Sequence, residues 1–309
     1  MLDVPIVRKP SFLTIFGPNV IIFILIRMDE AIENRFMKEG TRMGILNRLQ
    51  LWWNWLTTDP LGFALYLLYF AVSVLLTLIL HEIAHGYVAY RCGDPTAKML
   101  GRLSLDPRKH LDPIGTLCLV FLGFGWAKPV PVNPRNFKGN YRRDDFLVSV
   151  AGITVNLTLF ILSMALAVAL NGLLWKPEVI AANGGAREFL STSGIGYSVL
   201  VAGYGKDYSQ LMLHPWLMYV QRFLLMFYSM NLGVGLFNLL PIPPLDGYHL
   251  FNDLLFRGRF RLNPQVFQIA QIVLLVACFS GLLSNVINVV FNAVEGGVLH
   301  LFLLIAGQA

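Results

Sequence analysis

Residues 61–80 form a run of twenty residues without a charge, and the run ends in His81-Glu82-Ile83-Ala84-His85. An uncharged apolar stretch of this length predicts a transmembrane helix. His81 and His85 are four residues apart, so on a helix they share one face and can both bind one metal ion. Glu82 lies about 60° around the helix from His85, beside such an ion. Polar groups at the edge of a bilayer therefore predict a functional site here.

The composition indicates a protein that crosses a membrane several times. Hydrophobic residues make up 56% of the 309 positions and charged residues 14%, whereas a soluble domain carries about 25% charged residues. The net charge of +6 is expected in loops that face the cytoplasm and anionic lipid headgroups, so it does not indicate nucleic acid as a partner. The three cysteines lie far apart and predict neither a disulfide framework nor a cysteine zinc site.

Hydrophobic runs predict four core transmembrane helices, at residues 61–89, 146–170, 217–240 and 266–290. Ahead of them, residues 11–26 are apolar but short for a span, and residues 27–50 have the spacing of an amphipathic helix that rests on the membrane. Residues 298–306 form a short apolar tail that is expected to pack back against the last span. We therefore predict an all-α polytopic membrane protein with N-terminal apolar and amphipathic helices.

Residues 91–145 differ from the spans, because they hold ten Lys or Arg against five Asp or Glu and many Gly and Pro. Alternation at 101–105 and the Pro-Val-Pro-Val run at 129–132 favour extended backbone. We expect a small membrane-associated β-sheet or re-entrant loop, with its backbone covered by protein or by a water cavity. The excess of positive charge places 91–145 and the basic turn at 257–264 in the cytoplasm, and 171–214 outside.

A catalytic zinc ion needs a third protein ligand and an open position for water. Residues 238–247, Asn-Leu-Leu-Pro-Ile-Pro-Pro-Leu-Asp-Gly, end the third span with rigid extended backbone, which fixes the direction of Asp246. The alternative for Asp246 is the N-cap of a short helix at 248–256. The alternative for His81 and His85 is a structural one, in which two interfacial histidines and Glu82 satisfy one another.

Taken together, these motifs resemble the site-2 protease family of intramembrane metalloproteases, peptidase family M50, in its compact bacterial form without a PDZ domain. The resemblance covers roughly residues 61–255. It includes the Asp-Pro and His-Leu-Asp-Pro-Ile-Gly motifs within 106–115 and Gly-Trp-Ala-Lys-Pro-Val-Pro-Val-Asn-Pro at 125–134. Ile153 departs from the family pattern, which commonly has proline at that point.

The resemblance implies one Zn²⁺ per chain, held by His81, His85 and Asp246, with Glu82 as the catalytic base. It also implies hydrolysis of peptide bonds in or near transmembrane segments of membrane-protein substrates. The chain would then be an integral protein of the bacterial cytoplasmic membrane, with its active site toward the cytoplasm. We divide it into an N-terminal membrane-associated extension at 1–60, the peptidase core at 61–256, and a C-terminal transmembrane helix and tail at 257–309.

The peptidase core is expected to consist, in order, of the histidine helix, the loop at 91–145, a helix at 146–170, an extracytoplasmic segment at 171–216 and a helix at 217–247 that carries the aspartate. Within it, Asn156 and Asn238 are candidates for active-site support, Asn156 as a group that holds substrate or an oxyanion. An interhelical hydrogen bond is the alternative for Asn156.

The extended loop could pair with an unwound substrate strand. Its candidate residues are Gly125, Trp126, Lys128, Pro129, Val130, Pro131 and Asn133. His110 and His249 are expected to be interfacial histidines satisfied by their neighbours. Two other functions use the same residues, a catalytically silent membrane scaffold and a metal-transport protein. Transport predicts further polar residues along several spans, and these spans are nearly uncharged.

Overall fold

The computed structural model describes residues 45–113, 115, 127–259, 262–279 and 282–308. The regular structure of these residues is helical, apart from two isolated antiparallel β-bridges, Leu111 with Ala127 and Trp175 with Met212. The predictions for residues 11–26 and most of 27–50, and those for Gly125 and Trp126, lie outside the described residues.

Among the described residues, five helices are 16 residues or longer: α3 (Pro60–Arg91), α6 (Tyr141–Leu174), α10 (Leu217–Asn238), α12 (Pro264–Phe279) and α13 (Leu282–Ile305). The shorter α-helices are α2 (Ile45–Thr58), α4 (Thr96–Met99), α7 (Pro177–Ala182), α8 (Gly185–Leu190), α9 (Ile195–Val201) and α11 (Asp246–Leu255). Short 3₁₀ turns cover Pro107–Lys109, Pro134–Asn136, Tyr204–Lys206 and Ser209–Leu211.

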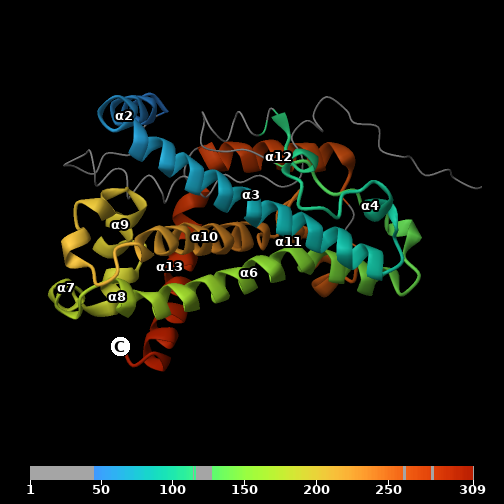
Figure 1. The fold of residues 1–309 in the computed structure, drawn as a ribbon. Coiled ribbons are helices and arrows are strands. Elements are labelled where there is room, and N and C mark those ends of the chain that lie inside the picture. The colour runs from blue at the N-terminus through green and yellow to red at the C-terminus, as the bar shows by residue number, and fades with distance from the viewer. Residues whose placement is uncertain (1–44, 114, 116–126, 260–261, 280–281, 309) are drawn as a thin grey trace, which may run out of the picture.

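Helices α3, α6 and α10 pack against one another along the length of the molecule (Figure 1). Helices α2, α7, α8 and α9 gather at the end where α3 begins, and α4 lies at the end where α3 stops (Figure 1). Helix α11 packs on α6, and α13 crosses α6 and α10. Short helices therefore lie at both ends of the three long helices, in two separate groups.

Three helices of the described chain are long and apolar enough to cross a membrane: Pro60–Arg91, Tyr141–Leu174 and Val286–Ile305. The first two contain the predicted spans at 61–89 and 146–170. Helix α10 matches the predicted helix at 217–240, but it is not among these three. It carries buried polar side chains, namely Gln221, Arg222, Asn231 and Asn238, and most of its other side chains are buried too.

The C-terminal region differs from the prediction of one helix over 266–290. Helix α12 ends at Phe279 and α13 begins at Leu282, with Ser-Gly between them in the sequence. Helices α12 and α13 run in different directions (Figure 1), and residues 280–281 between them lie outside the described residues. The residues expected to form a separate tail at 298–306 belong almost entirely to α13.

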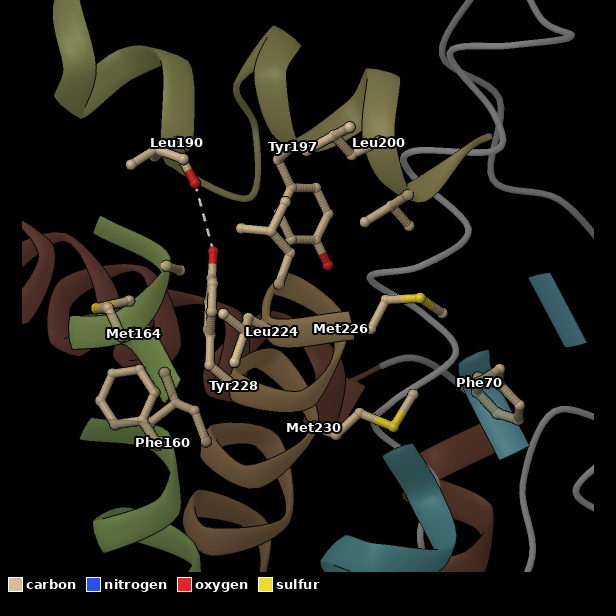
Figure 2. Packing of buried hydrophobic residues seen from close by; sticks show 14 of the residues in the cluster. Phe70, Phe160, Met164, Leu190, Tyr197, Leu200, Leu224, Met226, Tyr228 and Met230 are labelled. Atoms are coloured by element: carbon tan, nitrogen blue, oxygen red, sulfur yellow. Dashed lines mark hydrogen bonds between the residues drawn. The ribbon is translucent and has the colours of Figure 1, made fainter. Parts of the chain in front are cut away.

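A buried apolar cluster joins the long helices to the segment between α6 and α10. Phe160 and Tyr228 meet edge to face between α6 and α10, with ring centroids 6.2 Å apart (Figure 2). The Tyr228 hydroxyl donates to the Leu190 carbonyl at 3.4 Å and to Glu295 Oε1 at 3.1 Å. Since a buried hydroxyl is costly without a partner, these bonds fix α8 and α13 to α10.

The segment at 91–145 contains one β-bridge in its described part, where Lys128 N donates to the His110 carbonyl at 2.7 Å. The β-sheet or re-entrant loop stays a prediction, since residues 116–126 are outside the description. Asp94, just beyond α3, is buried, and several groups of this segment form hydrogen bonds to its carboxylate. Its carboxylate accepts from Asn133 N and Asn136 Nδ2, both at 2.7 Å, and from the Thr96 hydroxyl. The loop at 129–136 is thereby held against the end of α3.

We predict that Asp94→Asn lowers the free energy of unfolding by about 2 kcal/mol at neutral pH, because hydrogen bonds to a buried charge are lost. Burial acts to raise the pKa of Asp94, but hydrogen bonds from Thr96, Asn133 and Asn136 outweigh it and the pKa falls below its ordinary value. Since the folded state holds this carboxylate ionised, its stabilisation is present above the unfolded-state pKa of about 3.9 and is lost as the pH falls below it.

Thermal unfolding of the purified chain, measured against pH, checks this prediction. The difference between wild type and Asp94→Asn should shrink below about pH 4. Asp207→Asn, at an exposed position, is the matched control and should leave the unfolding midpoint unchanged. Equal midpoints for wild type and Asp94→Asn at neutral pH would contradict the role given to Asp94.

Candidate metal centre

Three predicted ligands converge where α3 meets the start of α11. His81 Nε2 and His85 Nε2 lie 3.0 Å apart. Asp246 Oδ2 lies 3.1 Å from His81 Nε2 and 3.2 Å from His85 Nε2. Within the described ranges, these three residues form the one group of His, Cys, Asp or Glu side chains spaced to hold a metal ion.

The donor set fits zinc. In a tetrahedral site with bonds of about 2.0–2.1 Å, neighbouring ligand atoms are separated by about 3.3–3.4 Å. The three observed separations of 3.0–3.2 Å are close to that spacing. Asp246 Oδ2 is also buried without a hydrogen-bond partner in the part of the chain that the structure describes. Three protein atoms leave one tetrahedral position open, which is the arrangement of a catalytic rather than a structural zinc site.

The tautomer of His85 is fixed by α6. His85 Nδ1 lies 2.7 Å from the Val148 carbonyl oxygen, which can only accept, so Nδ1 must donate. In a neutral imidazole Nε2 then carries a lone pair, and that lone pair points at Asp246 Oδ2 and His81 Nε2. Lone-pair atoms at such distances repel unless a metal ion or a shared proton lies among them, and the bond to Val148 leaves His85 Nε2 as the atom that can bind a metal ion.

Asn156 contacts the other imidazole. Its Nδ2 lies 3.1 Å from His81 Nδ1, and the side chain is fully buried. If His81 binds metal through Nε2, Nδ1 carries the proton, and the Asn156 amide must be turned by 180° so that Oδ1 accepts it. This contact is the interhelical hydrogen bond that the sequence analysis gave as the alternative for Asn156, and its partner is the proposed metal ligand His81. The side chain contacts His81 at Nδ1, the ring nitrogen that does not face Asp246, and its role toward substrate stays a prediction.

Gly152 leaves the space in which the imidazoles lie. A Cβ atom at this position would be 2.5 Å from both His81 Cε1 and His85 Nε2, which is closer than real contacts allow. The sequence analysis missed this glycine, although it lies one helical turn before Asn156 in the same span. The four-residue spacing between Gly152 and Asn156, the same as that between His81 and His85, was the available signal.

Glu82 is buried on α3, and its Oε2 accepts a hydrogen bond of 2.7 Å from Val130 N. The backbone of the loop at 129–133 therefore holds the Glu82 carboxylate in place. Lys128 and Asn133 also use their backbone N–H groups within the protein, on His110 O and Asp94 Oδ2. Pro129 and Pro131 have no N–H, so these two residues can offer only their carbonyl oxygens to a paired strand.

Three other polar residues singled out in the sequence, Asn238, His110 and His249, make their described polar contacts with groups other than the three ligand atoms. Asn238 Nδ2 donates to Val234 O in its own helix at 3.1 Å. His110 Nε2 donates to Ser104 O at 2.8 Å, and His249 Nδ1 lies 3.9 Å from Asp145 Oδ2. The capping alternative for Asp246 is wrong: Leu245 occupies the N-cap of α11, without a side-chain cap bond, and Asp246 is the first helical residue.

Comparisons with known proteins agree with this geometry. Residues 69–281 match the family described as Peptidase family M50. The chain is 36% identical over 234 residues to "Putative zinc metalloprotease YwhC" of Bacillus subtilis (strain 168), which covers 76% of this chain and 90% of that protein. It is 36% identical over 114 residues to "Putative zinc metalloprotease Rip2" of Mycobacterium tuberculosis (strain ATCC 25618 / H37Rv), covering 35% of this chain and 43% of that protein. No solved structure matches at a significant level.

This chain belongs to peptidase family M50, as the motifs in its sequence predict. The matched range contains α3 from its third turn onward, all of α6 and α10, and α11. The convergent histidines and aspartate therefore lie in the part of the chain that defines the family.

We predict that Gly152→Ala abolishes zinc binding while the chain still folds. The added methyl would meet both imidazoles at 2.5 Å, and the ligand atoms would have to separate. Gly172→Ala is the matched control on the same helix, because the nearest atom there is Gln308 Nε2 at 3.5 Å. Zinc content after dialysis, together with helix content by circular dichroism, measures the effect. Full zinc content in Gly152→Ala would contradict the packing described here.

A second prediction concerns Asn156. Loss of the group that orients a metal-binding histidine typically weakens metal affinity about 10–100-fold, and we expect this for Asn156→Ala. Asn156→Asp keeps an acceptor for His81 Nδ1 and should restore most of the affinity. Asn171→Ala removes another buried amide from α6 without touching the histidines and serves as the control. Competition with a zinc chelator gives the affinities, and equal losses in Asn156→Ala and Asn171→Ala would refute the role.

Proposed function

We propose that this chain is an intramembrane zinc metalloendopeptidase that hydrolyses peptide bonds in or near the transmembrane segments of other membrane proteins. The observation that carries the proposal is the convergence of His81, His85 and Asp246 beside the carboxylate of Glu82, on a helix apolar enough to span a bilayer. Membership of peptidase family M50, and relatives named as zinc metalloproteases, support both the metal and the reaction.

The zinc ion would be held, one per chain, by His81 Nε2, His85 Nε2 and Asp246 Oδ2. When bound in such a site, zinc lowers the pKa of a water molecule to about 7 and polarises a carbonyl group. The protein's part is to fix the three donor atoms. Val148 O and Asn156 orient the two imidazoles from α6, and the start of α11 supplies the carboxylate.

Glu82 acts as the proton carrier. Its carboxylate takes a proton from the attacking water and then donates it to the nitrogen of the leaving amine. The hydrogen bond from Val130 N to Oε2 fixes this carboxylate, which belongs to the residue after His81 on α3. Because Val130 belongs to the loop that also faces the substrate in this proposal, substrate binding and the position of the base are coupled.

The substrate must present an extended chain, since the amides of a helix are already hydrogen-bonded internally. Carbonyl oxygens of the Pro129–Pro131 stretch would accept hydrogen bonds from the N–H groups of such a strand. Gly125, Trp126 and Asn133 extend the same proposed surface. A deletion within this loop that left cleavage unchanged would remove this part of the proposal.

In the membrane, α3, α6 and α13 would be accompanied by α10 as a buried core helix. The N-terminal extension at 1–60, the peptidase core at 61–256 and the C-terminal part at 257–309 remain the proposed division of the chain. Asp246 and the histidine motif would face the cytoplasm, because the basic segments at 91–145 and 257–264 lie at the same end. The membrane would be the bacterial cytoplasmic membrane, as in the compact bacterial members that the sequence resembles.

Glu82→Gln is predicted to reduce cleavage by about 10³-fold or more, because the base is lost while the zinc ligands remain. The measurement is cleavage of a model transmembrane substrate by the chain reconstituted in vesicles, with and without a zinc chelator. Wild type should cut only with zinc, and Glu82→Gln should bind zinc without cutting. Cleavage that survives Glu82→Gln would refute the mechanism, and bound zinc with no cleavage by wild type would favour a scaffold.

The proposed sidedness has its own test. In a chain whose native cysteines are replaced, single cysteines are introduced by Lys109→Cys and Glu178→Cys, both at exposed positions. In intact cells, a membrane-impermeant thiol reagent should label the position at 178 and leave that at 109 unlabelled. The opposite pattern would place the active site outside and overturn the orientation.

A further inference from the structure

Arg102, in the segment that follows α4, contacts the backbone just before the loop at 129–133. Its Nη2 donates to the Lys128 carbonyl oxygen at 2.7 Å. Two residues later, Val130 N donates to Glu82 Oε2, also at 2.7 Å. One side chain therefore fixes the backbone close to the N–H group that holds the carboxylate of Glu82.

The segment of Arg102 and the loop meet α3 at one point. Gly86 lies four residues after Glu82, so the two positions share a face of the helix. A Cβ atom at Gly86 would lie 2.7 Å from Leu103 Cδ2 and 2.8 Å from Val130 Cγ1. The residue after Arg102 and the residue that holds Glu82 are therefore both packed against this face of α3.

The loop is held at both of its ends by bonds to other segments. At its start, Lys128 N donates to the His110 carbonyl at 2.7 Å, while Lys128 O accepts from Arg102. At its other end, Asn133 N donates to the carboxylate of Asp94. A hydrogen bond from a charged donor is about twice as strong as one between neutral groups. Arg102 therefore makes a strong contribution to holding the start of the loop.

Arg102 is a half-buried cation whose charge interacts with Glu82. Burial lowers the pKa of the Arg102 guanidinium, and the negative charge of Glu82 acts in the opposite direction. A guanidinium stays charged in proteins at neutral pH. Its positive charge is therefore attracted toward the carboxylate that the loop holds, and this attraction acts together with the bond to Lys128.

The proposed reaction needs the carboxylate of Glu82 in a fixed place. A displacement of about 1 Å at a reacting group can lower a rate about 10²-fold. In the proposed function an extended substrate binds carbonyl oxygens of Pro129 and Pro131, so it acts on the same backbone that holds the base. A group outside the loop must then keep Val130 in position, and Arg102 has the contact that does so.

We propose that Arg102 positions the catalytic base: through its bond to Lys128 O it holds the loop whose N–H group binds Glu82. In this role Arg102 acts through the loop and not by contact with the substrate. The inference rests on the proposed protease function, and it adds a residue that lies outside both the histidine motif and the Asp246 motif. Its substitution is expected to slow the reaction while the zinc ligands remain in place.

The first measurement is cleavage of a model transmembrane substrate, at several concentrations, by the full chain in detergent. Arg102→Gln should lower kcat by about tenfold or more while KM changes by about twofold or less, with the zinc content of wild type. Arg102→Lys should recover most of the rate, because its ammonium group can donate to the same carbonyl.

Arg108→Gln is the matched control for this measurement, since Arg108 lies in the same segment, is exposed and pairs with Asp106 at 3.5 Å. It should cleave like wild type. Wild-type kcat in Arg102→Gln would overturn the proposal. A loss of zinc in Arg102→Gln that accounts for the loss of rate would also overturn it, because the residue would then act on the ligands and not on the base.

The second measurement needs no activity. Deuterium exchange, followed by mass spectrometry, reports on the peptide covering 127–133. In Arg102→Gln this peptide should exchange about tenfold faster, because the bond from Val130 N to Glu82 opens more often, while peptides of α6 and α10 keep their wild-type rates.

The two measurements separate the two proposals. A wild-type chain that does not cleave would remove the proposed function, and the exchange at 127–133 would still show whether Arg102 holds the loop. Wild-type exchange of this peptide in Arg102→Gln would overturn the role of Arg102 even where the wild-type chain cleaves. Faster exchange throughout α6 and α10 would show a general loss of stability and would overturn it too.

Discussion

The central constraint in this molecule is that three electron-rich atoms from two distant segments lie within 3.2 Å of one another. Two come from one turn of α3 and the third from a helix that begins more than 150 residues later. Without a shared metal ion or proton these atoms repel, so the packing around them must hold them in place. Arg142 on α6 donates through Nε to the Asp253 carbonyl of α11 at 2.7 Å, which fixes the helix that carries Asp246.

Helix α6 is the platform for this arrangement. Val148 O, Gly152 and Asn156 recur at intervals of four residues, so they lie on one face, and all three meet the histidines of α3. Val148 supplies a carbonyl acceptor for His85, Gly152 supplies the space for both imidazoles, and Asn156 supplies an amide that contacts His81. The carboxylate of Glu82 is held by Val130 N, and Asp94 holds the loop that carries Val130. Each reacting group is therefore positioned by a contact from another segment of the chain.

The sequence predicted the parts of the site that depend on residue type. The spacing of His81 and His85, the uncharged run before them and the Asp246 motif were enough to predict the ligands and the family. It did not predict Val148 O or Val130 N, because backbone groups carry no residue identity and their use depends on long-range packing. The division of residues 266–290 between α12 and α13 was missed because the hydropathy of the sequence continues from one helix into the next.

X-ray absorption at the zinc K-edge, on the chain purified in detergent, addresses the central claim most directly. Convergence of two imidazoles and one carboxylate on a single ion predicts one zinc per chain, bonded only to nitrogen and oxygen at about 2.0–2.1 Å. The imidazole scattering should persist in Asp246→Ala, with one fewer light ligand from the protein and a lower zinc affinity. Sulfur among the ligands, or a spectrum and affinity that Asp246→Ala leaves unchanged, would contradict the account.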